Sequence, residues 1–281
     1  LTTGEKNPSV AIAFDSRNYS SEFALETARV LAANNIKAFI YRELRPVPQL
    51  SFTVRELGCV AGIVITASHN PGEYNGYKVF WSDGAQVISP HDEGIIKCVR
   101  MVGSISKVKK DDADRLEAAG LIKWLDDDMD RAYLDRVIEN SLCIEEIGKS
   151  RIKAVYSPLH GTGSAVIPPL FKKIGYNDII YVEEQMKPDG SFPSVKKPNP
   201  EEREALDMAI SYAEKHKADI VIATDPDSDR MGIAVKDHLG SYRVISGNHT
   251  GAILEHFILT IKKERGVLPP DGAVVKTVVT T

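Results

Sequence analysis

The sequence predicts an α/β protein with two consecutive α/β/α sandwich domains, built on mixed, mostly parallel sheets, plus the start of a third. Three observations support this. At roughly 150 residues per domain, 281 residues leave room for about two domains. Short β-branched runs alternate with longer amphipathic segments, which is the pattern of βαβ units. The pattern Ala-x-Ile-Val-Ile occurs at 61–65 and again at 218–222, each time before a polar loop and another strand. This repetition indicates two copies of one unit.

The first domain is predicted to span residues 1–128. Its strands are β-branched runs, and its helices repeat apolar residues at three- and four-residue spacing. The expected elements are, in order, a strand at 10–14, a helix at 21–34, a strand at 36–41, a short helix at 49–56, a strand at 61–65, a hairpin of 77–81 with 86–88, and a helix opened by Ser89-Pro90. Asp83-Gly84 suits the positive φ of a hairpin turn, and Ser-Pro suits a helix start.

The boundary is placed in the charge-rich stretch 107–130, where Asp126-Asp127-Asp128 is expected to be a solvated linker or a helix N-terminus. The second domain is predicted over residues 129–245. Its expected elements are a strand at 152–156, a helix at 164–174, a strand at 179–182, a Pro-rich loop at 187–200, a helix at 201–216, and strands at 218–222 and 231–235. Residues 246–281 then supply a helix at 249–263 and a strand at 273–279. One helix and one strand cannot cover a sheet, so this part is expected to be the incomplete start of a third domain.

Composition excludes several classes of protein. With 35 basic and 39 acidic residues the net charge is −4, which argues against a nucleic-acid partner. No apolar run approaches the roughly 20 residues that cross a bilayer, and no secretory signal is visible, so no membrane partner is expected. Cys59, Cys98 and Cys143 are far apart and lack metal-ligand spacing, which favours a reducing compartment. The predicted location is the cytoplasm.

The loop after the strand at 61–65 contains Ser68 beside His69, within Thr-Ala-Ser-His-Asn-Pro-Gly at 66–72. A Ser-His-Asp hydrolase is one interpretation, but sequence neighbours seldom form the nucleophile–base hydrogen bond, and a Gly-x-Ser-x-Gly elbow is missing. A second interpretation is a serine that carries a phosphoryl group, surrounded by His69, Lys78 and backbone amides. A third is a polar turn rich in Asn, Pro and Gly. The residues alone leave the last two open.

The loop after the strand at 218–222 is more specific, with Asp225, Asp227 and Asp229 at alternate positions before Arg230. Alternate residues of an extended loop project to one side, and carboxylate oxygens are ligands that Mg²⁺ prefers. Close carboxylates repel one another, which favours a metal over a solvated acidic turn. An EF-hand is excluded because Arg and Lys stand where it needs Gly and Glu. A dehalogenase-type phosphatase with Asp225 as nucleophile stays open.

A weaker candidate for a phosphate-binding loop is His160-Gly161-Thr162-Gly163, which follows the strand at 152–156. Its glycines and the following helix N-terminus could cradle a phosphate. A lone Gly-x-Gly is weak evidence, and a tight strand-to-helix turn is the preferred interpretation.

The two loops together resemble those of the α-D-phosphohexomutase family, the phosphoglucomutases and phosphomannomutases. The resemblance is carried by Thr-Ala-Ser-His-Asn-Pro at 66–71 and Asp-Pro-Asp-Ser-Asp-Arg at 225–230. Residues 73–81 are similar to the branch that includes bacterial phosphoglucomutase and phosphopentomutase. The resemblance covers essentially the whole chain. It implies that residues 1–128 are domain I with a phosphoserine loop, residues 129–245 domain II with a metal loop, and residues 246–281 the start of domain III.

The resemblance also implies roles for individual residues. Ser68 would be the phosphoserine, and His69 and Lys78 would supply acid-base and phosphate contacts. Arg17 and Arg230 would hold the phosphoserine region. The implied cofactor is Mg²⁺, and its implied ligands are Asp225, Asp227, Asp229 and an oxygen on Ser68.

The implied reaction interconverts hexose 1-phosphate and hexose 6-phosphate, with glucose as the expected sugar. Glucose 1-phosphate, glucose 6-phosphate and the intermediate glucose 1,6-bisphosphate would be its partners. A metal and nearby cations neutralise the phosphate oxygens, and enclosure keeps water from the phosphoenzyme. Phosphomannomutase and phosphopentomutase of the same family, a Mg-dependent dehalogenase-type phosphatase, and a non-catalytic binding module remain alternatives.

The sequence departs from the family pattern in three places. It lacks the Gly-rich segment before the first strand, the Gly-Glu-x-Ser-Gly sugar loop of the third domain, and the phosphate-binding loop of the fourth. The chain is therefore expected to be a fragment that carries the phosphoryl-transfer half, with little or no mutase turnover.

Overall fold

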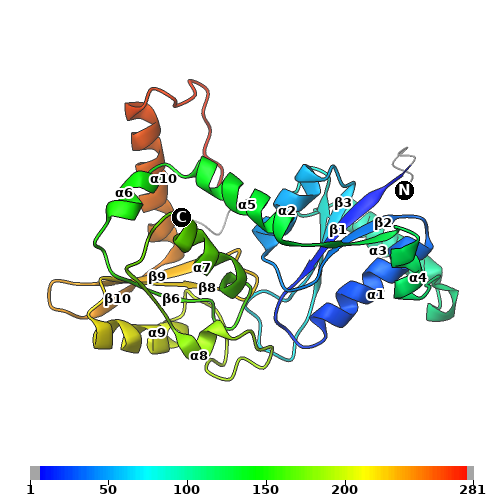
Figure 1. Cartoon of the computed structure of the whole chain (residues 1–281), viewed down its shortest axis with the longest axis horizontal. Helices are drawn as coiled ribbons and strands as arrows, with labels where there is room; N and C mark the ends of the chain where they lie inside the picture. Colours follow the sequence, from blue (N-terminus) through cyan, green and yellow to red (C-terminus); the bar gives the residue numbers. More distant parts are fainter. Residues whose placement is uncertain (1–6, 277–281) are drawn as a thin grey trace.

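The computed structural model describes residues 7–276 and contains two α/β units joined by a helix (Figure 1). The first unit has a five-stranded sheet in the order β4-β3-β1-β2-β5, in which β4 is antiparallel to β3 and the other neighbours are parallel. Its strands are β1 Ser9–Phe14, β2 Lys37–Tyr41, β3 Ala61–Ile65, β4 Tyr77–Trp81 and β5 Ile122–Leu125. Its helices are α1 Ser20–Ala33, α2 Val47–Glu56, α3 His91–Val102 and α4 Ala113–Ala118, with a short 3₁₀ turn at Ile105–Lys107.

The second unit has a five-stranded sheet in the order β10-β9-β8-β6-β7. Its strands are β6 Ala154–Ser157, β7 Ile179–Tyr181, β8 Ile220–Thr224, β9 Met231–Lys236 and β10 Tyr242–Ile245. The remaining helices are α5 Asp127–Asn140, α6 Ile144–Lys149, α7 Gly163–Lys173, α8 Glu183–Met186, α9 Arg203–His216 and α10 Gly247–Glu264. The predicted α/β architecture with two mixed sheets is confirmed.

The two sheets repeat one arrangement around the strands that share the Ala-x-Ile-Val-Ile pattern. In the first sheet β3 lies between parallel β1 and antiparallel β4, and in the second β8 lies between parallel β6 and antiparallel β9. The Ser68 loop leaves the carboxyl end of β3, and the Asp225 loop leaves the carboxyl end of β8. Equivalent strands thus present both loops, at the sheet edge where open α/β sheets bind ligands.

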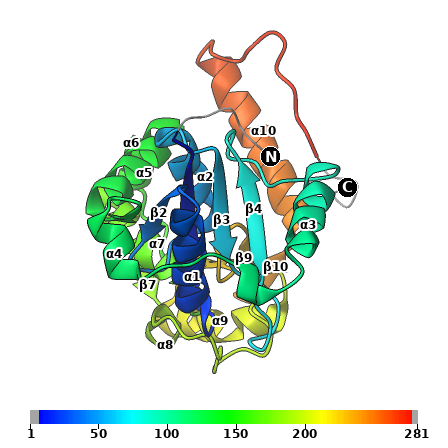
Figure 2. The ribbon, with the colours of Figure 1, turned by 90° about the vertical axis from the view of Figure 1, so that its right-hand side faces the viewer.

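The core of the first unit follows from the alternation of side chains along β1. Ile12 faces a cluster that contains Ala24, Ala28 and Ala32 of α1, whose four-residue spacing places them on one helix face. Ala11 and Ala13 face the opposite cluster, which contains Leu50 and Val54 of α2. The two helices therefore cover opposite faces of the sheet. Figure 2 shows α1 in front of the sheet and α3 beyond its β4 edge.

Helix α5 connects the two units and is tied to the first by a polar network. The Asp126 carboxylate accepts a hydrogen bond from Asp128 N, so the acidic run is a helix N-terminus, as predicted. Arg45 donates to both oxygens of Asp130, at 2.8 and 2.6 Å, and Gln49 Nε2 donates to the same carboxylate at 2.6 Å. On the other side Lys173 of α7 pairs with Asp135 at 2.5 Å. These contacts fix the helix against both units.

Several predicted elements were wrong. Residues 86–88 form no strand, because pairing with β4 is reduced to a single bridge between Phe80 and Gln86. Ser89 does not cap α3, whose N-cap is Pro90. The expected linker instead contains α4 and β5, and β5 pairs with β2 inside the first sheet. Helices α6 and α8 and strand β10 were not predicted. Residues 273–276 are irregular, and residues 277–279 of the predicted strand lie outside the described residues.

Helix α10 projects away from the second sheet in both views (Figures 1 and 2). It exposes apolar side chains on several sides, including Ile253, Leu254 and Phe257. Its assignment to a third domain stays a prediction. Among the described residues no helix is long and apolar enough to cross a membrane. The cytoplasmic location also stays a prediction.

Candidate active site

The two loops predicted from the sequence meet between the two units. Ser68 Oγ donates a hydrogen bond of 2.8 Å to Asp225 Oδ2, although 157 positions separate them in the sequence. Thr66 Oγ1 lies 2.7 Å from Asp15 Oδ2 and 3.1 Å from Asp227 Oδ2. Ser68 of one unit is therefore in direct contact with the acidic loop of the other.

The backbone at Ser68 is held in an uncommon conformation. Its φ is +53°, in the left-handed region that few non-glycine residues adopt. Ser68 N donates to Thr66 Oγ1 at 2.9 Å, and this bond helps to stabilise the turn. Ser68 Oγ also lies 3.2 Å from His69 Nδ1. Burial, together with the charges of Arg230 and Lys197, lowers the pKa of His69, so its imidazole is largely neutral at pH 7 and can accept a proton.

Arg17 organises the Ser68 loop from inside. Its guanidinium donates four hydrogen bonds to backbone carbonyls of this loop. The acceptors, with their distances, are Ser68 O at 2.6 Å, Asn70 O at 2.5 Å, Pro71 O at 2.8 Å and Tyr74 O at 2.9 Å. Arg17 is only 3% exposed, so it serves the loop and not the solvent. The resemblance assigned Arg17 to the phosphoserine region, and the geometry shows contacts with backbone oxygens.

Asp15 balances the charge of Arg17. Asp15 Oδ2 lies 3.2 Å from Arg17 Nε, close enough for an ion pair but out of line for a hydrogen bond. Burial raises the pKa of Asp15 and lowers the pKa of Arg17. Hydrogen bonds from Arg17 N, Ser20 Oγ and Thr66 Oγ1 oppose the effect on Asp15 by stabilising its carboxylate. Both charges are therefore held in the interior by a nearly complete set of partners.

The acidic loop gathers three carboxylates around one point. Ligand oxygens of Asp225, Asp227 and Asp229 all lie within 4.8 Å of one another, and the first two residues are fully buried. Burial and the charges of Asp227 and Asp229 raise the pKa of Asp225 to about 8. The compensating cation in contact with the cluster is Lys78, whose Nζ lies 2.8 Å from Asp227 Oδ2 and 3.4 Å from Asp229 Oδ2. Arg230 adds a more distant contact, with Nε 3.9 Å from Asp229 Oδ1, so the three acidic residues are only partly balanced by cations.

The residues fit a magnesium ion. Asp227 Oδ1 is buried and has no hydrogen-bond partner, although a buried carboxylate oxygen is costly to leave unpaired. A cation held by the three carboxylates would satisfy it. The donors are all hard oxygens, which suits Mg²⁺. The oxygen of Ser68, 2.8 Å from Asp225 Oδ2, lies close enough to bring a phosphoryl oxygen to the same ion.

The acidic loop is braced from behind by the His160–Gly163 turn. Thr162 N donates to Pro226 O at 2.8 Å, and the hydroxyls of Thr162 and Ser228 lie 3.0 Å apart. The amides of Ser164 and Ala165 also bond within the turn. These contacts support the interpretation as a tight turn, because the amides that would cradle a phosphate are already paired.

We expect Gly161→Ala to lower the free energy of unfolding by about 1–3 kcal/mol. A Cβ on Gly161 would overlap the backbone of Pro226, so either the turn or the acidic loop must shift. Urea unfolding measures the loss. The matched control is Gly94→Ala in α3, where a Cβ meets open space and helix propensity favours alanine. Equal stability of the two variants would contradict the close packing.

The predicted site residues fall into two groups. Ser68, His69, Lys78 and the three aspartates converge, whereas the Arg230 side chain is half-exposed, with Nε 3.9 Å from Asp229 Oδ1. Sequence reasoning gave no role to Asp15 and Thr66, which connect the Ser68 loop to β1 and to Asp227. Asp15 stands in a polar cluster directly after β1. Asp15 follows a strand, as the Ser68 and Asp225 loops do, and this position was the sequence signal that could have identified it as a site residue.

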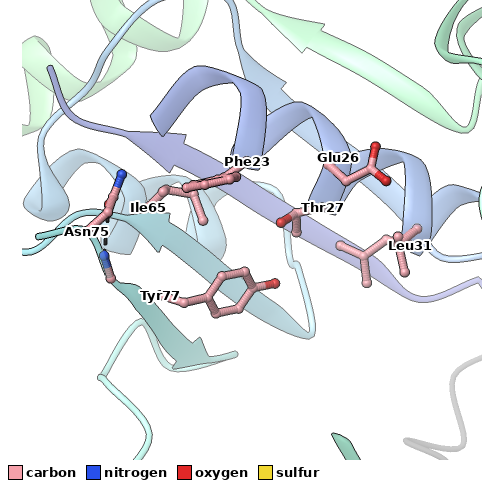
Figure 3. A pocket seen from close by; sticks show the side chains of 9 residues that line it. Phe23, Glu26, Thr27, Leu31, Ile65, Asn75 and Tyr77 are labelled. Carbon is pink, nitrogen blue, oxygen red and sulfur yellow. Dashed lines mark hydrogen bonds between the residues drawn. The ribbon is translucent and has the colours of Figure 1, made fainter. Parts of the chain in front are cut away.

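A separate apolar pocket lies between α1 and β4 (Figure 3). It has a volume of about 550 Å³ and is lined by Phe23, Leu31 and Tyr77, among others. It contains neither Ser68 nor the aspartates, and of its polar residues Asn75 donates to Ser20 Oγ and Asn18 O.

Comparison with known proteins matches both units to one family. Residues 1–104 match "Phosphoglucomutase/phosphomannomutase, alpha/beta/alpha domain I", and residues 131–240 match domain II of the same family. A phosphoglucomutase of Staphylococcus haemolyticus is 38% identical over 279 residues, which are 99% of this chain and 50% of that protein. A phosphoglucomutase of Staphylococcus aureus strain MRSA252 is 39% identical over 257 residues, 92% of this chain and 46% of that protein.

Solved structures show the same fold. The crystal structure of a phosphoglucomutase/phosphomannomutase family protein from Burkholderia thailandensis aligns with a TM-score of 0.71 at 22% identity, over 92% of this chain and 52% of that one. The chain spans about half the length of the curated relatives it matches.

Proposed function

The chain belongs to the phosphoglucomutase/phosphomannomutase family, and on that premise we propose that it carries the phosphoryl-transfer site of a phosphohexomutase. In this proposal Ser68 exchanges a phosphoryl group with a hexose phosphate, with glucose as the sugar. The observation that carries the proposal is the contact of Ser68 Oγ with Asp225 across the two units. A hydroxyl beside three close carboxylates and a lysine is suited to phosphoryl transfer once a cation joins them.

The reaction begins when Ser68 Oγ attacks a phosphorus of a hexose bisphosphate. The bond from Oγ to phosphorus forms as the bond from phosphorus to the sugar oxygen breaks. The Ser68 hydroxyl turns from Asp225 Oδ2 to His69 Nδ1, 3.2 Å away, and passes its proton there, while the departing sugar oxygen takes up a proton from water and His69 later returns its proton to the solvent. Transfer back to the sugar runs these steps in reverse. Ser68 can donate a phosphoryl group to one sugar oxygen of the hexose and take one back from the other, and this interconverts the 1-phosphate and the 6-phosphate.

Lys78 supplies positive charge at neutral pH. Burial alone would lower its pKa, but the carboxylates of Asp227 and Asp229 raise it above the usual value, so the ammonium persists. It lies beside Asp227 Oδ2, where it can also contact a phosphoryl oxygen. A bound Mg²⁺, held by Asp225, Asp227 and Asp229, would withdraw electron density from the phosphoryl oxygens. These groups act by electrostatics and position, which is what phosphoryl transfer requires.

The geometry does not favour a dehalogenase-type phosphatase. Such an enzyme needs a free carboxylate oxygen on Asp225 as nucleophile. Here Asp225 Oδ1 accepts from Arg230 N at 3.0 Å, and Oδ2 accepts from Ser68 Oγ at 2.8 Å, with the residue fully buried. Ser68 is the more accessible nucleophile.

The test is to incubate the chain with glucose 1,6-bisphosphate and Mg²⁺ and to measure its intact mass. We expect the mass of one phosphoryl group to be added to the wild-type chain and to Ser211→Ala, a matched substitution on the exposed face of α9. Ser68→Ala is expected to stay unmodified. Equal phosphorylation of Ser68→Ala would overturn the proposal. Mannose 1,6-bisphosphate and ribose 1,5-bisphosphate, tested in the same way, separate the phosphomannomutase and phosphopentomutase alternatives.

A further inference from the structure

The Pro-rich loop at 187–200, which belongs to the second unit, reaches across to the first unit beside Arg17. Gly190 lies against the backbone of Arg17 and Asn18 so closely that a Cβ would overlap it. Gly72 of the Ser68 loop likewise lies against the carbonyl of Gly190. The loop therefore touches both the strand end that carries Arg17 and the loop that carries Ser68.

Phe192 makes the side-chain contact of this crossing. Its ring covers the guanidinium of Arg17, with Cζ 5.1 Å from the ring centroid, which is the geometry of a cation–π interaction. Phe192 is 3% exposed and adopts a φ of +48°. A bulky residue at positive φ is an uncommon conformation, which persists only where surrounding contacts stabilise it.

The loop is anchored from behind by a buried polar network of the second unit. The ring of His160 lies 3.0 Å from Lys187 O through Nδ1 and 2.8 Å from Ser194 Oγ through Nε2. Gln185 Nε2 donates to the same Ser194 oxygen at 2.8 Å. Ser157 Oγ, at the end of β6, donates to Gln185 Oε1 at 2.6 Å. The network attaches the chain before Phe192, at Lys187, and the chain after it, at Ser194, to the second sheet.

Arg17 has its donors and its aromatic contact on different parts of the guanidinium. The terminal nitrogens donate to carbonyls of the Ser68 loop, while one face of the group is covered by Phe192. Movement of Phe192 therefore exposes the guanidinium to water without removing any of its hydrogen bonds. Water would then compete with the four carbonyls for these donors, which would let the carbonyls, and with them Ser68, shift relative to the acidic loop.

We propose that Phe192 is a positioning residue for phosphoryl transfer: through Arg17 it keeps the Ser68 loop in register with the acidic loop of its own unit. The inference rests on the proposed function of Ser68. Phe192 does not touch the reacting atoms. It acts because transfer requires the serine oxygen and the acidic loop to be aligned to a fraction of an ångström.

The test compares Phe192→Leu, which keeps an apolar side chain, with Phe192→Tyr, which keeps the aromatic face. Phe192 is one of the residues that line a pocket of about 660 Å³. Single-turnover phosphorylation of Ser68 by glucose 1,6-bisphosphate gives the transfer rate and the half-saturating concentration. We expect Phe192→Leu to slow transfer about tenfold with the half-saturating concentration unchanged, and Phe192→Tyr to restore the rate.

The matched control is Phe171→Leu, in which Phe171 of α7 loses the aromatic ring that packs on Tyr176, away from Arg17. It is expected to lower stability without slowing transfer. Equal slowing in Phe171→Leu and Phe192→Leu, or an unchanged rate in Phe192→Leu, would overturn the positioning role.

Hydrogen exchange of residues 66–76 tests the role without any substrate. Phe192→Leu is expected to raise the exchange rate of this loop, and Phe171→Leu and Phe192→Tyr to leave it unchanged. If the wild-type chain does not become phosphorylated, the proposed function fails, but this measurement still decides whether Phe192 holds the loop. Unchanged exchange in Phe192→Leu would contradict the inference by itself.

Discussion

Replacement of Arg17 by methionine is expected to lower the free energy of unfolding by about 3–5 kcal/mol and to abolish phosphorylation of Ser68. Methionine fills similar space but donates nothing to the four carbonyls of the Ser68 loop. It also leaves Asp15, whose pKa burial already raises, without a cation. Urea unfolding gives the stability, and the intact-mass experiment gives the phosphorylation.

Two further variants separate loss of fold from loss of function. Arg29→Met removes a surface pair with Glu26 and is expected to cost less than about 1 kcal/mol and leave phosphorylation intact. Arg17→Lys retains the positive charge but not the planar fork that reaches several carbonyls. It should fold with a smaller loss of stability and still phosphorylate Ser68 at least 100-fold more slowly, roughly the effect of a misplaced reacting group. Normal phosphorylation of Arg17→Lys would show that charge alone is sufficient.

Asp227→Asn is expected to abolish the stabilisation of the chain by Mg²⁺ and to slow Ser68 phosphorylation by about 1000-fold. Asparagine keeps the shape of the side chain but removes one charge and one of the oxygens that a cation needs. In the wild-type chain, Mg²⁺ at 100 times its dissociation constant should raise the free energy of unfolding by about 2.7 kcal/mol. Thermal unfolding with and without Mg²⁺ measures the difference, and calorimetry measures binding directly.

The control for this variant is Asp207→Asn on α9, an exposed residue that pairs with Arg203. It removes the same charge from the second unit at a position outside the acidic cluster. Mg²⁺ should stabilise Asp207→Asn as strongly as the wild-type chain. If Asp227→Asn retains the Mg²⁺ effect, the three carboxylates are not the binding site.

The sequence predicts most of the fold because the central strands are unambiguous. The strands at 61–65 and 77–81 were predicted with the observed bounds, and α1 and α9 to within two residues at each end. These elements combine strong apolar periodicity with clear breakers. The family resemblance implied that Ser68 and the aspartates share one site, and in the structure Ser68 Oγ contacts Asp225.

What was missed depends on tertiary context. Strand β5 is four residues long and lies in a charged stretch, so only its pairing with β2 makes it a strand. The buried role of Phe192 leaves no local pattern, because its partner Arg17 lies far away along the chain. The bridge at Gln86 is too short to extend the predicted hairpin, although Asp83-Gly84 does form the turn.

The hydrogen bonds of the Ser68 loop have a consequence for the order in which the protein folds. The loop's carbonyls are paired by a side chain 51 positions earlier than Ser68, and its serine by a carboxylate 157 positions later. Contacts so distant along the chain form late, after both sheets exist to bring them together. During synthesis the serine is therefore an ordinary hydroxyl until residue 230 has left the ribosome. Under the proposed function, Ser68 would acquire its reactivity only when the second unit closes onto the first.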